Sequence, residues 1–206
     1  MDPKKKTLSA TERDEAAREA WRERAAGVDP ARLVFVDETG SHLGFVRTYA
    51  RSPRGERARG SAPRNRGQTR TTIGSVTLDG MGPGLLIEGG VSTAGFEAYV
   101  GRVLAPTLRP GQIVVMDNLQ QHRGARTREL IEARGAALWF LPSYPPDLSP
   151  IEEAFAKLEA LLRTAAARTP EALVAAIWAA LAAITPADAC GYFTHCGYPA
   201  PVPQLS

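Results

Sequence analysis

Three carboxylates stand where the expected elements of this chain could bring them together. Asp37 ends the run VFVD, Asp117 ends VVMD, and Glu152 follows a proline-rich turn at the start of an expected helix. In open α/β sheets, ligands bind at the edge where the strands end. Carboxylates held on rigid elements suit hard cations such as Mg²⁺. Two such ions can activate an attacking oxygen and stabilise a leaving oxygen at phosphorus, so the chemistry open to this set is metal-assisted phosphoryl transfer.

Each of these carboxylates also has a simpler structural explanation. An aspartate after a strand is often only a turn residue. Ser149 and Glu152 have the spacing of a capping box, with Pro150 at the first helical position. The adjacent Glu153 has the spacing of an i,i+4 partner for Lys157. Helical geometry alone therefore leaves the choice between Glu152 and Glu153 open.

The elements that must position these residues are strands and helices in mixed order. Apolar runs predict strands at 33–36, 71–78, 85–87, 113–116 and 137–141, with 42–49 as a hairpin partner of the first across a turn at 39–41. Helical spacing predicts helices at 9–26, 92–108, 127–133, 150–167 and 170–184. We therefore expect an α/β fold with a mixed sheet and helices on both faces, with Trp178 in the core.

Basic residues are concentrated in one segment. The chain of 206 residues has 25 basic and 22 acidic residues, which gives a formal net charge of only +3. Residues 47–70 contain a single acid, Glu56, and eight arginines: Arg47, Arg51, Arg54, Arg57, Arg59, Arg64, Arg66 and Arg70. Glycine, serine and proline interrupt this segment and predict a loop. Because arginine suits multidentate contact with phosphate, we expect this Arg-rich loop to contact nucleic acid; a solubilising loop is the alternative.

Composition argues against several classes of protein. Two cysteines, Cys190 and Cys196, provide no disulfide framework, and together with His195 they lack the paired spacing of a zinc site. The longest apolar stretch, 173–184, is too short to cross a bilayer. The N-terminus has no apolar run typical of a secretory signal. We expect a cytoplasmic, nucleoid-associated protein with no membrane partner.

Three ordered segments resemble those of a known family. VFVDETG, VVMDNLQQHRG and FLPSYPPDLSPIEEAF together resemble the catalytic core of the mariner-type DDE transposases, in their bacterial insertion-sequence branch. The family signature is Asp, Asp and Glu with 34 residues before the Glu, and 34 residues separate Asp117 from Glu152. This spacing selects Glu152 over Glu153. The chain departs from the family's third segment at Pro145 and Ser149, which keep turn and capping chemistry.

The resemblance implies a fold and an activity. The fold would be ribonuclease-H-like (retroviral integrase-like), an α/β mixed sheet flanked by helices. The activity would be that of a DNA transposase, which cleaves DNA strands and transfers the freed 3′-OH to target DNA. Asp37 would bridge two Mg²⁺ or Mn²⁺ ions, while Asp117 and Glu152 would each hold one. The alternatives are a stand-alone Mg²⁺-dependent nuclease of similar fold and an inactive DNA-binding remnant.

Several neighbouring residues are supporting candidates. His122 and the basic Arg123 follow Asp117 as such a pair tends to do in the family, and both are expected to contact DNA. Asn118 either orients a metal-bound water or caps the turn. Asp147 is expected to be a turn residue, with a role in metal binding left open. Glu38 is expected either to contact the metal-binding residues without binding the metal itself or to lie on the surface.

The expected organisation is a single catalytic domain. Residues 1–30 would form a basic helix or remnant linker, 31–168 the catalytic core that includes the Arg-rich loop, and 169–206 a helical extension packed on the core. The segment before Asp37 has no room for the helix-turn-helix pair that recognises transposon ends in this family. A partner encoded in an upstream reading frame would explain this, as would truncation. A homodimer is expected because transposition must join two DNA ends.

Overall fold

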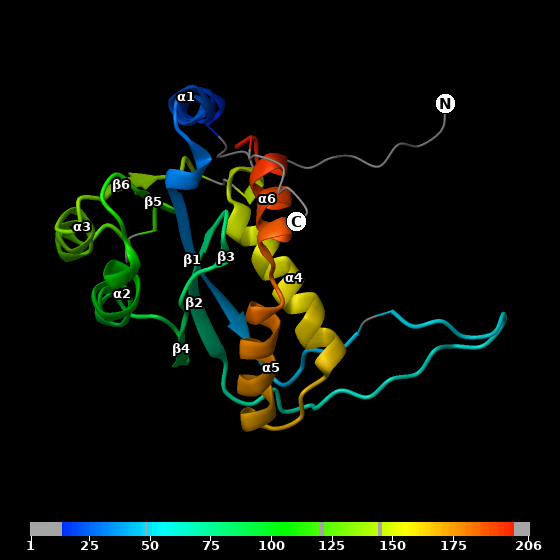
Figure 1. Cartoon of the computed structure of the whole chain (residues 1–206). Helices are drawn as coiled ribbons and strands as arrows, with labels where there is room; N and C mark the ends of the chain where they lie inside the picture. The colour runs from blue at the N-terminus through cyan, green and yellow to red at the C-terminus, as the bar shows by residue number, and fades with distance from the viewer. Residues whose placement is uncertain (1–13, 48, 120–121, 144–145, 200–206) are drawn as a thin grey trace, which may run out of the picture.

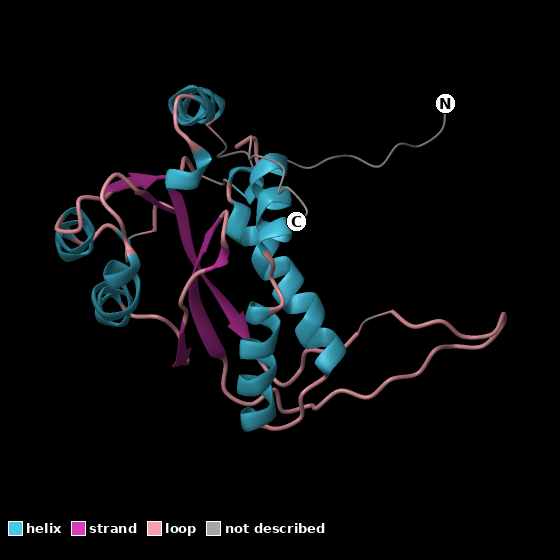
Figure 2. Cartoon of the chain, viewed as in Figure 1, coloured by secondary structure: helices cyan, strands magenta, loops and turns pink. Residues whose placement is uncertain are grey.

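The chain folds into a mixed β-sheet with helices on both faces (Figures 1 and 2). The computed structural model describes residues 14–47, 49–119, 122–143 and 146–199. Its strands are β1 (Leu33–Ser41), β2 (Arg70–Thr77), β3 (Gly80–Met81), β4 (Leu85–Glu88), β5 (Ile113–Met116) and β6 (Ala137–Phe140). Its helices are α1 (Glu15–Ala26), α2 (Thr93–Tyr99), α3 (Ala125–Glu132), α4 (Pro150–Ala165), α5 (Pro170–Ala182) and α6 (Pro186–His195).

The sheet has the strand order β3–β2–β1–β5–β6, and β4 also pairs with β2. β1 runs antiparallel to β2 and parallel to β5, while β5 runs parallel to β6. The apolar residues of β1 and β5 are buried because helices cover both faces of these central strands. The expected α/β class with mixed strand directions is therefore confirmed.

Alternation along β1 divides its side chains between the two faces. Leu33 and Phe35 pack in one core cluster together with residues of α1, α4 and α6. Val34 and Val36 pack in a second cluster with residues of α2 and α3. Because successive side chains of a strand point to opposite faces, Asp37 continues the series of Leu33 and Phe35. The strand therefore presents Asp37 on the face that α4 covers.

The predicted hairpin after the first strand was wrong. β1 continues through the expected turn at 39–41 and pairs with β2, from Phe35 opposite Val76 to Ser41 opposite Arg70. None of the described residues among 42–49 is in a strand. The eight residues of β2 are almost all buried and offer β1 a long ladder of backbone partners. The Arg-rich loop is thus the connection between the two longest strands of the sheet.

Helix boundaries also differ from the expected ones. The helix predicted over 92–108 ends as a regular α-helix at Tyr99, and a π-helical segment and a 3₁₀ turn containing Pro106 follow it. The first helix begins after its N-cap Asp14, and residues 9–13 of the predicted helix lie outside the described residues. Helix α6 was not predicted at all. Its signal was Thr185, which forms a capping box with Asp188 around Pro186.

Helix α1 packs against the core. Trp21 is only 5% exposed, and its ring meets that of Trp139 edge-on at 5.8 Å between centroids. Arg24 lies over the face of Trp139, 3.6 Å from the ring centroid. The described helix EAAREAWRERAA has as many glutamates as arginines, and the expectation of a basic helix or remnant linker over 1–30 stays a prediction. The lysines near the N-terminus lie outside the described residues.

The C-terminal helices pack along α4. Lys157 of α4 forms an ion pair with Asp188 of α6 at 2.6 Å, and Phe193 of α6 packs in the same cluster as Phe155. Trp178 of α5, expected in the core, is instead 42% exposed. Among the described helices, none alone has the length and apolar composition needed to span a membrane. Only α5 and α6 taken together, with a bend of 74° between them, meet that requirement.

The packing of α1 leads to a test by denaturation. Trp21→Ala removes a buried indole and its contact with Trp139, so we expect the free energy of unfolding to fall by about 3–5 kcal/mol. Trp178→Ala, at an exposed position, should change it by roughly 1 kcal/mol or less. Urea denaturation followed by circular dichroism measures both values. Equal losses for the two variants would contradict the packing described for α1.

Candidate active site

Asp37 lies in the interior of the sheet, where its charge is costly. It stands opposite Gly74 of β2, two residues beyond the last pair that β1 forms with β5. Its Oδ1 accepts a hydrogen bond of 2.8 Å from the backbone N–H of Glu38. Burial, followed by the negative charges of Glu152, Asp117 and Glu38, raises the pKa of Asp37 to about 7. A nearby cation would stabilise the ionised form of Asp37.

Asp117 follows β5 directly and is held by a buried histidine. Its Oδ1 accepts a hydrogen bond from the backbone N–H of Leu119 at 3.2 Å and also contacts Nδ1 of His122. The side chain of His122 has no exposed surface, stacks 4.2 Å from the ring of Phe96, and places Nε2 3.0 Å from Oε2 of Glu38. The ring therefore joins Asp117 to Glu38.

The buried ring of His122 is cationic at neutral pH. Burial opposes protonation, but hydrogen bonds and charges from Asp117 and Glu38 outweigh it and raise the pKa of His122 to about 9. A contact of His122 with a DNA phosphate was expected from the sequence. In the structure the ring is instead enclosed between Asp117 and Glu38, with no exposed surface.

Glu152 lies in the first turn of α4, and its simplest alternative explanation fails. The expected capping box is not formed, since Ser149 occupies the N-cap position without a capping hydrogen bond from its side chain. Burial, followed by the charges of Asp117 and Glu159, raises the pKa of Glu152. The adjacent Glu153 contacts Nδ1 of His195 on α6. Only Glu152 of the two thus faces the other carboxylates.

The three predicted carboxylates come within electrostatic reach of one another from three different elements. Glu152 and Asp117 both raise the pKa of Asp37, and Asp117 also raises that of Glu152. Among the described residues, no three side chains of His, Cys, Asp or Glu are arranged to ligate one ion. The donor set nevertheless fits a hard divalent cation, because carboxylate oxygens are its preferred ligands and carboxylates that repel one another are stabilised by positive charge.

The remaining sequence candidates lie around this trio. Arg123 donates from Nε to Oδ1 of Asn118 at 2.6 Å, and both side chains are exposed. Asp117 accepts the backbone N–H of Leu119 in this turn, and the expected role of Asn118 stays a prediction. Asp147 forms an ion pair with Arg18 of α1. This ion pair and the contact of His122 with Glu38 were not predicted, since neither pairing follows from spacing along the chain.

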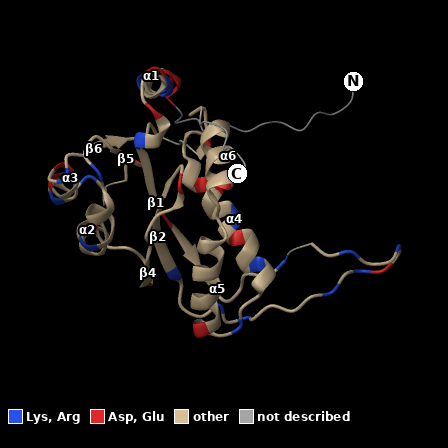
Figure 3. Cartoon of the chain, viewed as in Figure 1, with Lys and Arg blue, Asp and Glu red and all other residues tan. Residues whose placement is uncertain are grey.

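The Arg-rich loop extends from the sheet as a long ribbon with basic residues along it (Figure 3). Its base is fastened to the end of α4, where Arg47 donates to Oγ1 of Thr164 at 3.1 Å and Arg168 donates to the carbonyl oxygen of Ser61 at 3.3 Å. Arg70 is an exception among the eight arginines. It lies in β2, 21% exposed, and forms an ion pair of 2.8 Å with Glu88. Its charge is thus neutralised locally.

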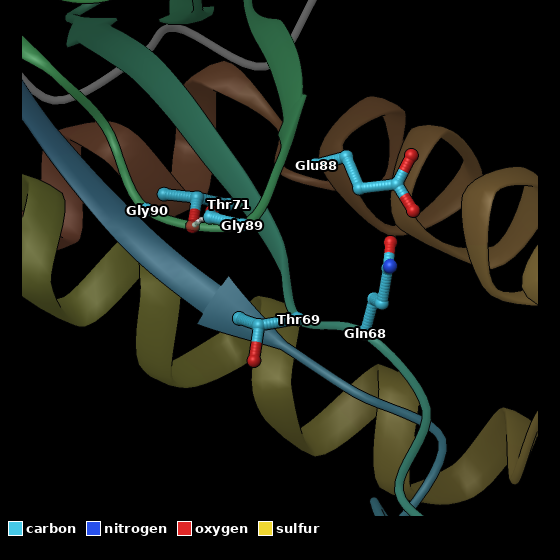
Figure 4. A pocket seen from close by; sticks show the side chains of 6 residues that line it. All are labelled: Gln68, Thr69, Thr71, Glu88, Gly89 and Gly90. Atoms are coloured by element: carbon cyan, nitrogen blue, oxygen red, sulfur yellow. Dashed lines mark hydrogen bonds between the residues drawn. The ribbon is translucent and has the colours of Figure 1, made fainter.

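An open pocket lies at the base of this loop, further along the β1–β2 ladder than Asp37 (Figure 4). It is lined by Gln68, Thr69, Thr71, Glu88, Gly89 and Gly90. Thr71 donates to the carbonyl oxygen of Gly89, and Glu88 is already paired with Arg70. None of the six lining residues is basic, and none belongs to the carboxylate trio.

A mixed sheet with carboxylates on its central strand, after the neighbouring parallel strand and on a flanking helix defines a ribonuclease-H-like domain of the DDE class. The chain belongs to the DDE superfamily endonuclease family, whose sequence pattern matches residues 32–174. No curated protein sequence matches it. The family to which the motifs pointed is thereby confirmed.

Solved structures with the same fold include those of Mos1 transposase. The chain is similar to the Mos1 transposase paired-end complex with left transposon end, with a TM-score of 0.74, 17% identity and coverage of 97% of this chain and 64% of that chain. For the catalytic domain of Mos1 mariner transposase the TM-score is 0.61, the identity 16% and the coverage 97% and 92%. The chain therefore spans less than two thirds of the transposase in the complexes and nearly all of its catalytic domain. The expected ribonuclease-H-like fold is confirmed.

The raised pKa of Asp37 leads to a prediction for stability against pH. A carboxyl whose pKa rises on folding, here from 3.8 to about 7, favours the folded state at low pH and loses that contribution as pH rises through 7. Asp37→Asn removes this penalty. At about 1.4 kcal/mol per pKa unit, the variant should gain roughly 2 kcal/mol relative to the unmodified chain between pH 5 and pH 8.

The measurement is urea denaturation with a chelator present at both pH values. The control is Asp79→Asn, because the side chain of Asp79 is 86% exposed, so that folding removes little water from its carboxylate. Parallel stability curves for the unmodified chain and Asp37→Asn would contradict the charge conflict at Asp37.

Proposed function

We propose that this chain is the catalytic domain of a mariner-type DNA transposase. Asp37, Asp117 and Glu152 would hold two Mg²⁺ or Mn²⁺ ions for DNA cleavage and strand transfer. The observation that carries the proposal is the mutual electrostatic effect of these three carboxylates, which come from separate elements of a DDE fold. Similar structures include Mos1 paired-end complexes with Mn and with Mg, which supports a divalent ion as cofactor.

The residues of the chain would divide the work at this site. Bound divalent ions stabilise negative charge on the attacking and leaving oxygens of a phosphodiester, so the protein needs no nucleophilic side chain. Asp37 lies on the central strand and is influenced by both other carboxylates, which suits the position shared between ions. His122 would hold Asp117 in one orientation through the contact between its Nδ1 and Oδ1 of Asp117. Glu152 lies in the first turn of α4, so the position of its carboxylate depends on where that helix begins.

DNA is the proposed partner of both the site and the Arg-rich loop. Seven arginines of the loop, Arg47 to Arg66, lie on an exposed segment that could follow a phosphate backbone, and Arg123 stands beside the carboxylates. A helix-turn-helix partner encoded upstream would supply recognition of transposon ends. Joining of two ends predicts a homodimer in the synaptic complex, acting on DNA of the nucleoid in the cytoplasm.

A second candidate is a divalent-metal nuclease that cuts DNA without joining it, which the endonuclease description of the family favours. The two functions separate in one assay with pre-cut transposon-end DNA, a target duplex and Mn²⁺. A joined product supports a transposase, whereas cleavage of the duplex without joining supports a nuclease. Absence of both reactions would contradict catalysis by this chain alone.

The same assay distinguishes the two adjacent glutamates. Glu152→Gln keeps the shape of the side chain but removes the charge proposed to hold a metal ion, so we expect activity to fall on the order of 10³-fold. Glu153→Gln is the matched control, because Glu153 pairs with His195, and it should retain activity within about threefold. Equal losses in both variants would argue against the specific role of Glu152.

Salt dependence tests the Arg-rich loop as a DNA-binding segment. Each phosphate contact contributes about 0.9 to the slope of log affinity against log salt. Replacing Arg54 and Arg57 by Gln should therefore lower this slope by about 2 in a fluorescence-anisotropy titration with duplex DNA. The control replaces Arg126 and Arg128, which pair with glutamates on α3, and should leave the slope nearly unchanged. An unchanged slope in the loop variant would exclude the loop from the DNA contact.

A further inference from the structure

The turn that starts α4 is held from a distant part of the chain by a buried arginine. The side chain of Arg18 on α1 has no exposed surface, and its Nη2 forms an ion pair with Oδ2 of Asp147. Asp147 belongs to the 3₁₀ turn Pro146–Leu148, which leads directly to the N-cap of α4. A buried guanidinium is costly unless it is paired, so this contact strongly favours one position of the turn.

A second tether reaches the next residue of the same turn. The indole Nε1 of Trp21 donates to the hydroxyl of Tyr198 at 2.9 Å, and that hydroxyl donates to the carbonyl oxygen of Leu148 at 2.7 Å. Both hydrogen bonds are buried, where an unmade bond is expensive. Helix α1 and the C-terminal segment thus hold Asp147 and Leu148 by independent contacts.

These two tertiary contacts lie at the start of α4, where the N-cap residue makes no side-chain hydrogen bond to the helix. Ser149 makes no side-chain capping bond, and Pro150 has no backbone N–H to be capped. The start of α4 is therefore positioned by tertiary contacts to the preceding turn. Glu152 lies on the first turn of this helix, so any shift of the turn moves its carboxylate relative to Asp117.

We propose that Arg18 and Tyr198 are positioning residues for Glu152, through Asp147 and Leu148 respectively. The inference rests on the proposed function, in which Glu152 helps to hold a divalent ion. It assigns to α1 and to the C-terminal segment a role in the affinity of the site for metal, in addition to their contribution to the core. Their contacts set the distance between the carboxylate on α4 and those of Asp37 and Asp117.

The test measures Mn²⁺ binding by isothermal titration calorimetry to the full chain, with no DNA present. Tyr198→Phe removes the hydroxyl and both of its hydrogen bonds but keeps the packed ring. Asp147→Asn removes the charge that pairs with Arg18. Each variant should bind Mn²⁺ about 10-fold more weakly, as is usual when a group that orients a metal ligand is lost. Asp147→Glu, which restores the charge, should recover most of the affinity.

Controls separate positioning from general loss of structure. Arg22→Gln lies on the same helix in an exposed pair with Glu19 and should bind Mn²⁺ like the unmodified chain. Circular dichroism of each variant without metal establishes that it is folded. If Tyr198→Phe and Asp147→Asn are folded and bind Mn²⁺ normally, the positioning role is wrong. If either variant is unfolded at 25 °C, the contacts are needed for folding itself, and the positioning role is likewise overturned.

The outcome for Glu152→Gln keeps this inference distinct from the proposed function. If the unmodified chain binds Mn²⁺ and Glu152→Gln does not, the metal site stands whatever the tether variants show. If the unmodified chain binds no Mn²⁺, the proposed function fails first, and the positioning role fails with it.

Discussion

The repulsion among three neighbouring carboxylates, two of them partly buried, is the constraint on which the rest of this structure depends. Asp37 sits on the central strand, fixed by the ladder to β2 and covered by α4, so it can neither move away nor be fully solvated. Asp117 and Glu152 add negative charge from two further directions. Such an arrangement is unfavourable for a fold by itself, and it becomes favourable when positive charge is supplied.

Some of that positive charge is built into the chain. His122, enclosed between Asp117 and Glu38, is protonated because the two carboxylates outweigh the cost of burying it. Arg18 has a comparable role beside the start of α4, where it pairs with Asp147. Each buried cation therefore compensates an acid in the segments that carry the trio, while Asp37 itself has no such partner among the contacts described.

On the surface, positive charge is concentrated in the Arg-rich loop, which lies outside the core. The Arg-rich loop contributes no buried apolar side chain from 49 to 62, so its sequence is not constrained by packing. Arg47 and Arg168 fasten it near the end of α4, and the carbonyl oxygen of Arg66 accepts a hydrogen bond from the backbone N–H of Leu43. A near-zero net charge thus conceals a basic surface segment and an acidic site, which are the two features that a DNA-processing domain requires.

The sequence by itself determined the fold class and most of the strands, and it singled out the three carboxylates that the fold brings near one another. Two kinds of feature can be read along the chain without any knowledge of tertiary contacts. They are the apolar runs at β1 and β5 and the spacing between Asp117 and Glu152. Tertiary structure alone decided which strand pairs with the end of β1, because pairing depends on competition between distant segments. It also decided that His122 is buried against Glu38 and that Arg18 pairs with Asp147. These contacts join residues 84 and 129 positions apart, and no local pattern specifies partners over such distances.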